Sequence, residues 1–206
     1  RLRRQDRHVN IQKLEQGLQE GNPLPAEVDL GVDLDLRIPP AYKQFTRQYR
    51  IGDIVTVTVI KALDSGGLLV EFDEILKGTI FESELELNEN GQLKTARNYP
   101  LGKTIQARIY QMFDKTASIR CSVFRLATIP HVEVGQIIEA TVLIVREDTR
   151  EAGLLRIICS WCDKYQVQVQ AFVETIDAAL ETGDAITVRI TKVDERVNMI
   201  QGVYES

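Results

Sequence analysis

The chain has few of the residue types that build metal centres and covalent active sites. Its 206 residues include two histidines, His8 and His131, and three cysteines. A structural zinc site needs four ligands, and nucleophilic triads usually need a histidine beside the nucleophile. Cys159 and Cys162 have Cys-x-x-Cys spacing, but no βαβ helix begins there as in redox motifs. We therefore interpret these cysteines as structural, and we expect no enzyme activity, no bound metal and no cofactor.

Long hydrophobic runs are also lacking. No apolar run approaches the roughly 18–20 residues of a membrane span, and no apolar region follows the basic start at residues 1–8. An odd number of cysteines without framework spacing is typical of a reducing compartment. We therefore expect a soluble, cytoplasmic protein without a membrane partner. The opening residue is arginine rather than methionine, which is compatible with a fragment of a longer protein.

Short alternating runs rich in β-branched residues dominate the rest. Hydrophobic residues make up 44% of the chain, which suffices for one or two compact domains. Val55, Val57 and Val59 fall on one face of the first such run, between threonines and isoleucines on the other. Alternation with period two is typical of a half-buried strand, so the valines predict its core face. A turn at residues 64–67 and a hydrophobic run from Leu68 then predict a hairpin.

Three further strands complete this segment. The third begins at residues 77–78, where Gly78 predicts the bulge or sharp bend that a small barrel needs. The fourth alternates over residues 105–109, a turn follows at residues 114–116, and the fifth covers residues 119–122. The sequence therefore predicts five strands between residues 51 and 122.

Two landmarks accompany these strands. A glycine-acidic pair, Gly52 and Asp53, precedes the first strand, and residues 78–85 form a Gly-x-x-x-x-Ser-Glu-Leu segment at the end of the third. This order resembles the OB-fold RNA-binding domain named after ribosomal protein S-one. The resemblance implies a five-stranded barrel that binds single-stranded RNA by stacking bases on aromatic side chains beside basic residues.

The binding face implied by the resemblance is unevenly kept. Two of the family's aromatic positions fall on Leu69 and Thr79, and its histidine position falls on Phe81, which keeps a flat ring. The alternative is that Phe81 belongs to the barrel core and that the nearby cations are ordinary solvated charges. Whether Phe81 and these cations share one face separates the two interpretations. The cations that would form a basic rim are Lys61, Lys77, Lys103, Arg108 and Arg120.

A second copy of the pattern follows downstream. Residues 132–145 match the first strand and its glycine, and residues 183–206 match the two closing strands. Repetition predicts tandem units, so we expect a mostly β chain with two five-stranded OB barrels at residues 51–127 and 128–206. Phe172 and Trp161 are the candidate exposed aromatic residues of this divergent second barrel.

Charge separates the two predicted barrels. Residues 128–206 carry 7 Lys and Arg against 13 Asp and Glu, a net charge of −6. Nucleic-acid affinity comes largely from phosphate neutralisation, so we expect this barrel to bind RNA only weakly by itself. In the first barrel, the acidic stretch formed by Glu82, Glu84, Glu86 and Glu89 favours a solvated loop.

The first 50 residues form a different segment. Arg3 to Gln19 predicts a helix with a single apolar stripe, which would dock either on a partner or back on a barrel. Hydrophobic residues alternate with other residues over 28–36, and prolines lie on both sides of this stretch. This pattern predicts an extended strand or a linker. A short helix is expected from Tyr42 to Tyr49. The basic cluster at the start favours a solvated end over phosphate contacts.

Two functions of different class remain open. In the first, the chain is a non-catalytic module that binds single-stranded RNA, or single-stranded DNA, over Phe81. In the second, the barrels form a scaffold that binds protein within a ribosomal, transcription or nuclease assembly. The N-terminal helix or the acidic second barrel would then contact the protein partner.

Overall fold

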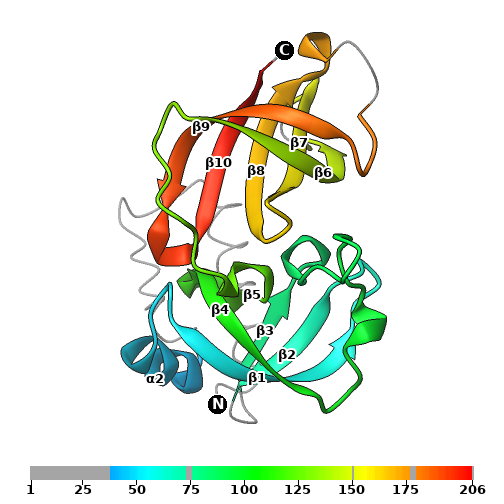
Figure 1. Cartoon of the computed structure of the whole chain (residues 1–206). Helices are drawn as coiled ribbons and strands as arrows, with labels where there is room; N and C mark the ends of the chain where they lie inside the picture. The colour runs from blue at the N-terminus through cyan, green and yellow to red at the C-terminus, as the bar shows by residue number, and fades with distance from the viewer. Residues whose placement is uncertain (1–37, 73–75, 150, 177–179, 206) are drawn as a thin grey trace, which may run out of the picture. The chain divides into compact units, whose positions relative to one another are not determined.

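Two closed five-stranded β-barrels form the described part of the chain (Figure 1). Both barrels lie within one compact unit, Ile38–Ser206. The predicted mostly β architecture with two tandem barrels is confirmed. The predicted helix at residues 3–19, the basic start and the segment at residues 28–36 lie outside the described residues. The computed structural model describes residues 38–72, 76–149, 151–176 and 180–205.

The strand order of the first barrel is β1-β2-β3-β5-β4, closed by pairing of β1 with β4. All its pairs are antiparallel except β3 with β5, which is the order of an OB fold. Short 3₁₀ helices follow β3, β4 and β5: η2 (Glu82–Glu84), η4 (Asp114–Thr116) and η5 (Phe124–Leu126). The strands are β1 (Ile54–Ala62), β2 (Leu68–Phe72), β3 (Leu76–Ile80), β4 (Thr104–Phe113) and β5 (Ser118–Ser122).

The core of this barrel contains the predicted valine face and a helix. Val55, Val57 and Val59 are all buried, as predicted. Helix α2 (Pro40–Gln48), the predicted short helix, begins with proline in its first turn, where the missing N–H costs nothing. Its Tyr42 and Phe45 are buried in the same core, so α2 covers the barrel.

Gly78 has a packing role. It pairs with Val70 and Ile119 in regular registers, so of the predicted bulge or sharp bend at this position the bulge is wrong. A Cβ at residue 78 would lie 2.6 Å from Cε2 of Phe72 and 3.0 Å from the carbonyl oxygen of Ile119. Glycine is required because the Phe72 ring covers this point of β3.

The bulges occur in β1 and β4 instead. The β1–β2 register shifts between Val59 and Lys61, and the β4–β5 register shifts between Ile109 and Gln111. An extra residue reverses the alternation of a strand. Before each bulge, the odd-numbered residues of the strand therefore point into the core. After the bulge, the odd-numbered residues point outward.

The second barrel repeats this architecture in the strand order β10-β8-β7-β6-β9. Its parallel pair is β8 with β10, and register shifts recur in β6 after Val142 and in β9 after Ile190. The predicted internal repeat is confirmed. The strands are β6 (Ile137–Glu147), β7 (Leu154–Trp161), β8 (Tyr165–Phe172), β9 (Ala185–Asp194) and β10 (Met199–Glu205).

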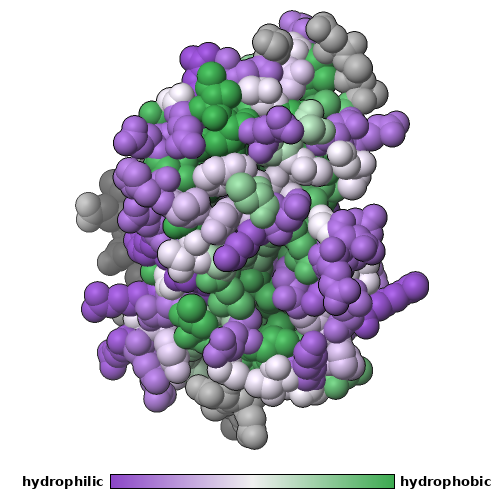
Figure 2. Space-filling model, viewed as in Figure 1, coloured by the Kyte–Doolittle hydropathy of each residue, from purple (hydrophilic) through white to green (hydrophobic). Residues whose placement is uncertain are grey.

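Some apolar side chains remain on the surface. The face drawn in Figure 2 carries hydrophobic areas among hydrophilic side chains over both barrels. Scattered apolar residues of this kind are normal on a folded protein. No described helix is both long and apolar enough to span a bilayer. The large exposed hydrophobic residues are Ile54, Leu101, Val134, Ile137, Phe172, Val173 and Val203.

The two cysteines of the Cys-x-x-Cys spacing do not converge. Cys159 lies in the core of the second barrel, whereas Cys162 is exposed in the turn after β7. The structural interpretation of Cys159 is therefore supported by its packing. Within the described ranges, no group of three or more His, Cys, Asp or Glu side chains could hold a metal ion.

Thiol reactivity should follow this burial. Burial raises the pKa of both Cys121 and Cys159 to about 12, which leaves almost no thiolate at pH 8. We expect Ellman's reagent to titrate one thiol of the native protein within minutes and three in denaturant. Cys162→Ser should abolish the fast reaction, and a fast reaction that survives this substitution would contradict the buried placement of the other two cysteines.

Candidate nucleic-acid interface

One row of side chains crosses all five strands of the first barrel on its outer face. Cross-strand pairs join Lys61 to Leu69, Leu69 to Thr79, Thr79 to Arg120 and Arg120 to Gln111. Directly paired residues point to the same face of a sheet. The row therefore brings together side chains that lie up to 59 residues apart in the sequence, Lys61 to Arg120.

A groove of about 630 Å³ lies over the middle of this row. Phe81, directly after β3, and Phe113, the last residue of β4, both line it and are half-buried. Phe81 is therefore not part of the barrel core. The other side chains along the groove that matter below are Leu69, Lys77, Thr79 and Arg120.

The guanidinium of Arg120 contacts both phenyl rings. Its guanidinium carbon is 4.8 Å from the centroid of the Phe81 ring and 4.7 Å from that of the Phe113 ring. Its Nη1 also donates a hydrogen bond of 3.0 Å to Oε1 of Gln111. Each cation–π contact contributes about 0.5–2 kcal/mol, so three neighbours together fix the direction of this side chain.

The five predicted cations separate into two groups. Lys77 and Arg120 line the groove, and Lys61 stands exposed at the β1 end of the same row. Lys103 lies elsewhere, with its Nζ 5.2 Å from the centroid of the Tyr99 ring. Arg108 lies outside the groove as well.

Arg108 is committed to backbone contacts. Its Nε donates to the carbonyl oxygen of Arg125 at 2.8 Å, and its Nη1 donates to the carbonyl oxygen of Gly52 at 2.7 Å. Burial lowers the pKa of its guanidinium. Arg108 thus ties the start of β1 to the segment after β5, and it does not contribute to a rim around Phe81.

The landmarks and the strand order agree in the first barrel. Gly52 and Asp53 precede β1, Gly78 lies within β3, and the Ser-Glu-Leu segment forms η2 and its end. The second barrel repeats the strand order and both bulges. Both barrels therefore have the OB fold. No family model and no curated protein matches the chain.

Solved structures with partial likeness include three of different kinds. The chain is 20% identical to a chain of the a/eIF2alpha–aDim2p–rRNA complex from Pyrococcus horikoshii OT3, with a TM-score of 0.32, over 36% of this chain and 44% of that one. GSP13 from Bacillus subtilis is 19% identical, with a TM-score of 0.32, over 40% of this chain and 62% of that one. A multidomain protein with nucleic acid binding domains from Streptococcus pneumoniae is 13% identical, with a TM-score of 0.29, over 76% of this chain and 52% of that one. The chain spans less than two thirds of each, and likeness at this level has no bearing on function.

The corresponding face of the second OB barrel has a different chemistry. Its cross-strand row pairs Ile158 with Gln168, Gln168 with Gln201 and Gln201 with Lys192. Gln201 thus takes the place of Arg120, and Gln170, two residues beyond Gln168, takes that of Phe81. None of the described residues that line the groove on this face is aromatic.

The candidate aromatic residues of the second OB barrel lie away from this row. Phe172 is 49% exposed at the end of β8, where it pairs with Leu154. Trp161 is half-buried and packs against Tyr165, with 5.7 Å between ring centroids. The prediction of Trp161 as an exposed aromatic residue is wrong, because its ring packs partly on the core.

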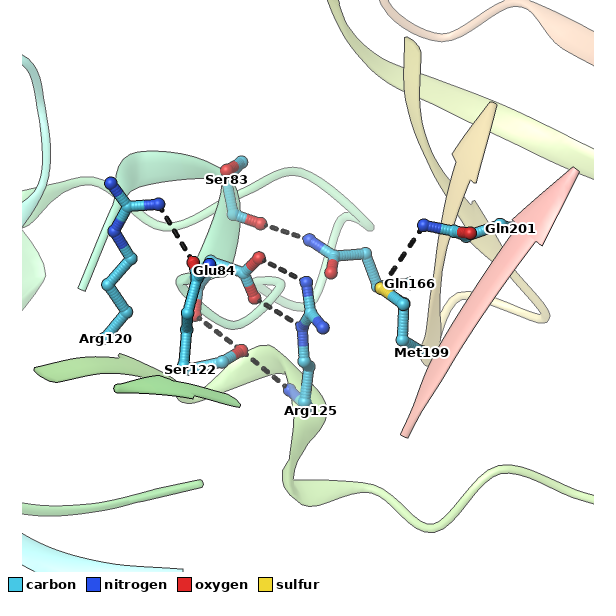
Figure 3. A network of polar contacts seen from close by, with 9 residues as sticks. Ser83, Glu84, Arg120, Ser122, Arg125, Gln166, Met199 and Gln201 are labelled. Atoms are coloured by element: carbon cyan, nitrogen blue, oxygen red, sulfur yellow. Dashed lines mark hydrogen bonds and ion pairs between the residues drawn. The ribbon is translucent and has the colours of Figure 1, made fainter. Parts of the chain in front are cut away.

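A buried ion pair joins two 3₁₀ helices of the first OB barrel, η2 and η5. Glu84 accepts hydrogen bonds from Nε and Nη2 of Arg125 at 2.8 and 2.6 Å, and both residues are only 3% exposed (Figure 3). The guanidinium carbon of Arg125 also lies 4.5 Å from the centroid of the Tyr110 ring. The expectation of a wholly solvated acidic stretch is therefore wrong at Glu84, which links η2 to η5.

Proposed function

We propose that the first OB barrel is a non-catalytic module that binds single-stranded nucleic acid, foremost RNA. The observation that supports this proposal is the groove in which Phe81, Phe113, Lys77 and Arg120 lie together. Bases stack on aromatic side chains for about 1–3 kcal/mol each, and cations beside the rings contact phosphates. A net charge of −5 favours a local grip of this kind over the coating of duplex DNA.

We propose a different role for the second OB barrel, as a contact surface for protein. Its net charge of −6 repels polyanions. On its equivalent face, the uncharged amides of Gln170 and Gln201 stand where the first OB barrel has Phe81 and Arg120, and Arg156 is the cation that lines the groove on this face among the described residues. Such a barrel would orient the first one within a larger assembly rather than extend the RNA path.

The substitution Phe81→Ala tests the RNA proposal. We expect the affinity for a labelled single-stranded RNA to fall about tenfold, because one stacking surface is lost. Fluorescence anisotropy at two salt concentrations measures it, and binding should weaken as salt rises. Phe172→Ala is the matched control: it removes an exposed phenyl ring from the other barrel and should leave affinity unchanged.

Three results would overturn the proposal: no measurable binding, binding that ignores salt, or equal losses for both substitutions. If RNA does not bind, a protein-binding scaffold becomes the better account of both barrels. Circular dichroism of both variants checks that the fold is retained.

A further inference from the structure

Neighbouring side chains hold the guanidinium of Arg120 in place, but within the described residues only its Nη1 donates a hydrogen bond. The rings of Phe81 and Phe113 both contact it, and Gln111 accepts a hydrogen bond from its Nη1. The Nε–H and Nη2–H groups have no hydrogen-bond acceptor among the residues that the structure describes. These groups form one edge of the planar fork, which matches two acceptors lying side by side.

Of the two purines, guanine alone offers two adjacent acceptors, O6 and N7, on its Hoogsteen edge. Adenine presents N7 beside an amino donor, which would oppose a guanidinium N–H. A phosphate also offers paired oxygens. The groove walls around Arg120, however, include Leu69, Phe81 and Phe113, and Lys77 is the other cation among the described residues that line it.

Flat apolar walls beside a hydrogen-bonding fork suit a base better than a phosphate. We propose that Arg120 makes the groove of the first OB barrel select guanine over adenine in single-stranded RNA, by donating from Nε and Nη2 to O6 and N7. This proposal rests on the proposed RNA-binding function. The two rings and Gln111 already hold the fork, so binding need not immobilise a free arginine side chain. Lysine could not replace it, because an ammonium group is a point charge without a planar pair of donors.

The test uses one RNA in four forms. Uridine-rich oligonucleotides of about nine nucleotides carry a single central guanine, inosine, 7-deazaguanine or adenine. Inosine keeps both O6 and N7, whereas 7-deazaguanine lacks N7. We expect the guanine and inosine forms to bind the wild-type protein about tenfold more tightly than the other two.

Arg120→Lys should remove this preference while keeping the cation. All four oligonucleotides should then bind alike, within about threefold of the wild-type affinity for the adenine form. Arg97→Lys is the matched control, because Arg97 is exposed in a 3₁₀ helix outside the groove. This variant should keep the full preference for guanine.

Two failures are distinguishable. If no oligonucleotide binds, the proposed function itself is wrong. If all four bind the wild-type protein equally and salt weakens them together, RNA binding stands, guanine selectivity is overturned, and Arg120 contacts phosphate instead. The comparison of guanine with 7-deazaguanine needs no variant, so it decides the matter even if Arg120→Lys were to unfold.

Discussion

Replacing Glu84 by glutamine is expected to lower the free energy of unfolding by about 3–5 kcal/mol. The substitution keeps the shape of the side chain but removes the only carboxylate that the structure pairs with Arg125 among the described residues. The side chain of Arg125 is only 2% exposed, so its guanidinium would remain charged and buried without a counter-ion. Breaking one side of such a pair costs more than the pair itself contributes.

The matched control lies two residues along the same segment. Glu86 pairs with Lys94 at 2.7 Å, but both side chains of this pair are substantially exposed. Glu86→Gln should change stability by less than about 1 kcal/mol, since exposed ion pairs contribute little. Urea denaturation followed by fluorescence measures both variants.

Equal and small losses for the two variants would show that Arg125 finds water or another acceptor when Glu84 is neutral. Replacing both Glu84 and Arg125 by methionine sharpens the test. If charge burial causes the loss, this double variant should be more stable than Glu84→Gln, because it leaves no unpaired charge.

The strands could be predicted from the sequence because the physical rule behind them is local. Alternation of valines in β1 and the glycines before each first strand repeat in both halves of the chain. An inward-facing Val55 needs no information from distant residues. Even the divergent second barrel keeps this pattern, because core packing tolerates many hydrophobic side chains of similar volume.

The candidate site was only partly predictable because bulges change which face a residue occupies. Strict alternation from Ile105 and Ala107 would place Phe113 inside the barrel, and it was not among the candidate residues. The extra residue after Ile109 turns Gln111 and Phe113 outward. Nothing in the local sequence announces this bulge, and only its register with β5 reveals it.

Ion pairing was hidden for a similar reason. Glu84 and Arg125 lie 41 residues apart, and each resembles an ordinary surface charge in its own segment. Arg108 shows the opposite case. Its position in a strand predicted a cation free to contact RNA, but its guanidinium donates to the carbonyl oxygens of Gly52 and Arg125. Long-range polar partners therefore decide which charges are free to bind a ligand.

Removing both rings beside Arg120 should reduce RNA affinity by about thirtyfold. We expect about tenfold from either Phe81→Ala or Phe113→Ala, because each loses a stacking surface and loosens the guanidinium. The two rings hold the same side chain, with centroids 4.8 and 4.7 Å from its guanidinium carbon. Once one ring is gone, Arg120 is already less well placed, so the second substitution has less to remove.

A double-mutant cycle by fluorescence anisotropy measures this coupling, which we expect to be about 0.5–1 kcal/mol. The melting temperature should change little, because both rings are half-buried and lie outside the core cluster. Strict additivity would mean that each ring stacks a base independently and that Arg120 needs neither for its position. An unchanged affinity for Phe113→Ala would confine the RNA path to Phe81. The contact of the Arg120 guanidinium with both rings would then serve the folded structure rather than RNA binding.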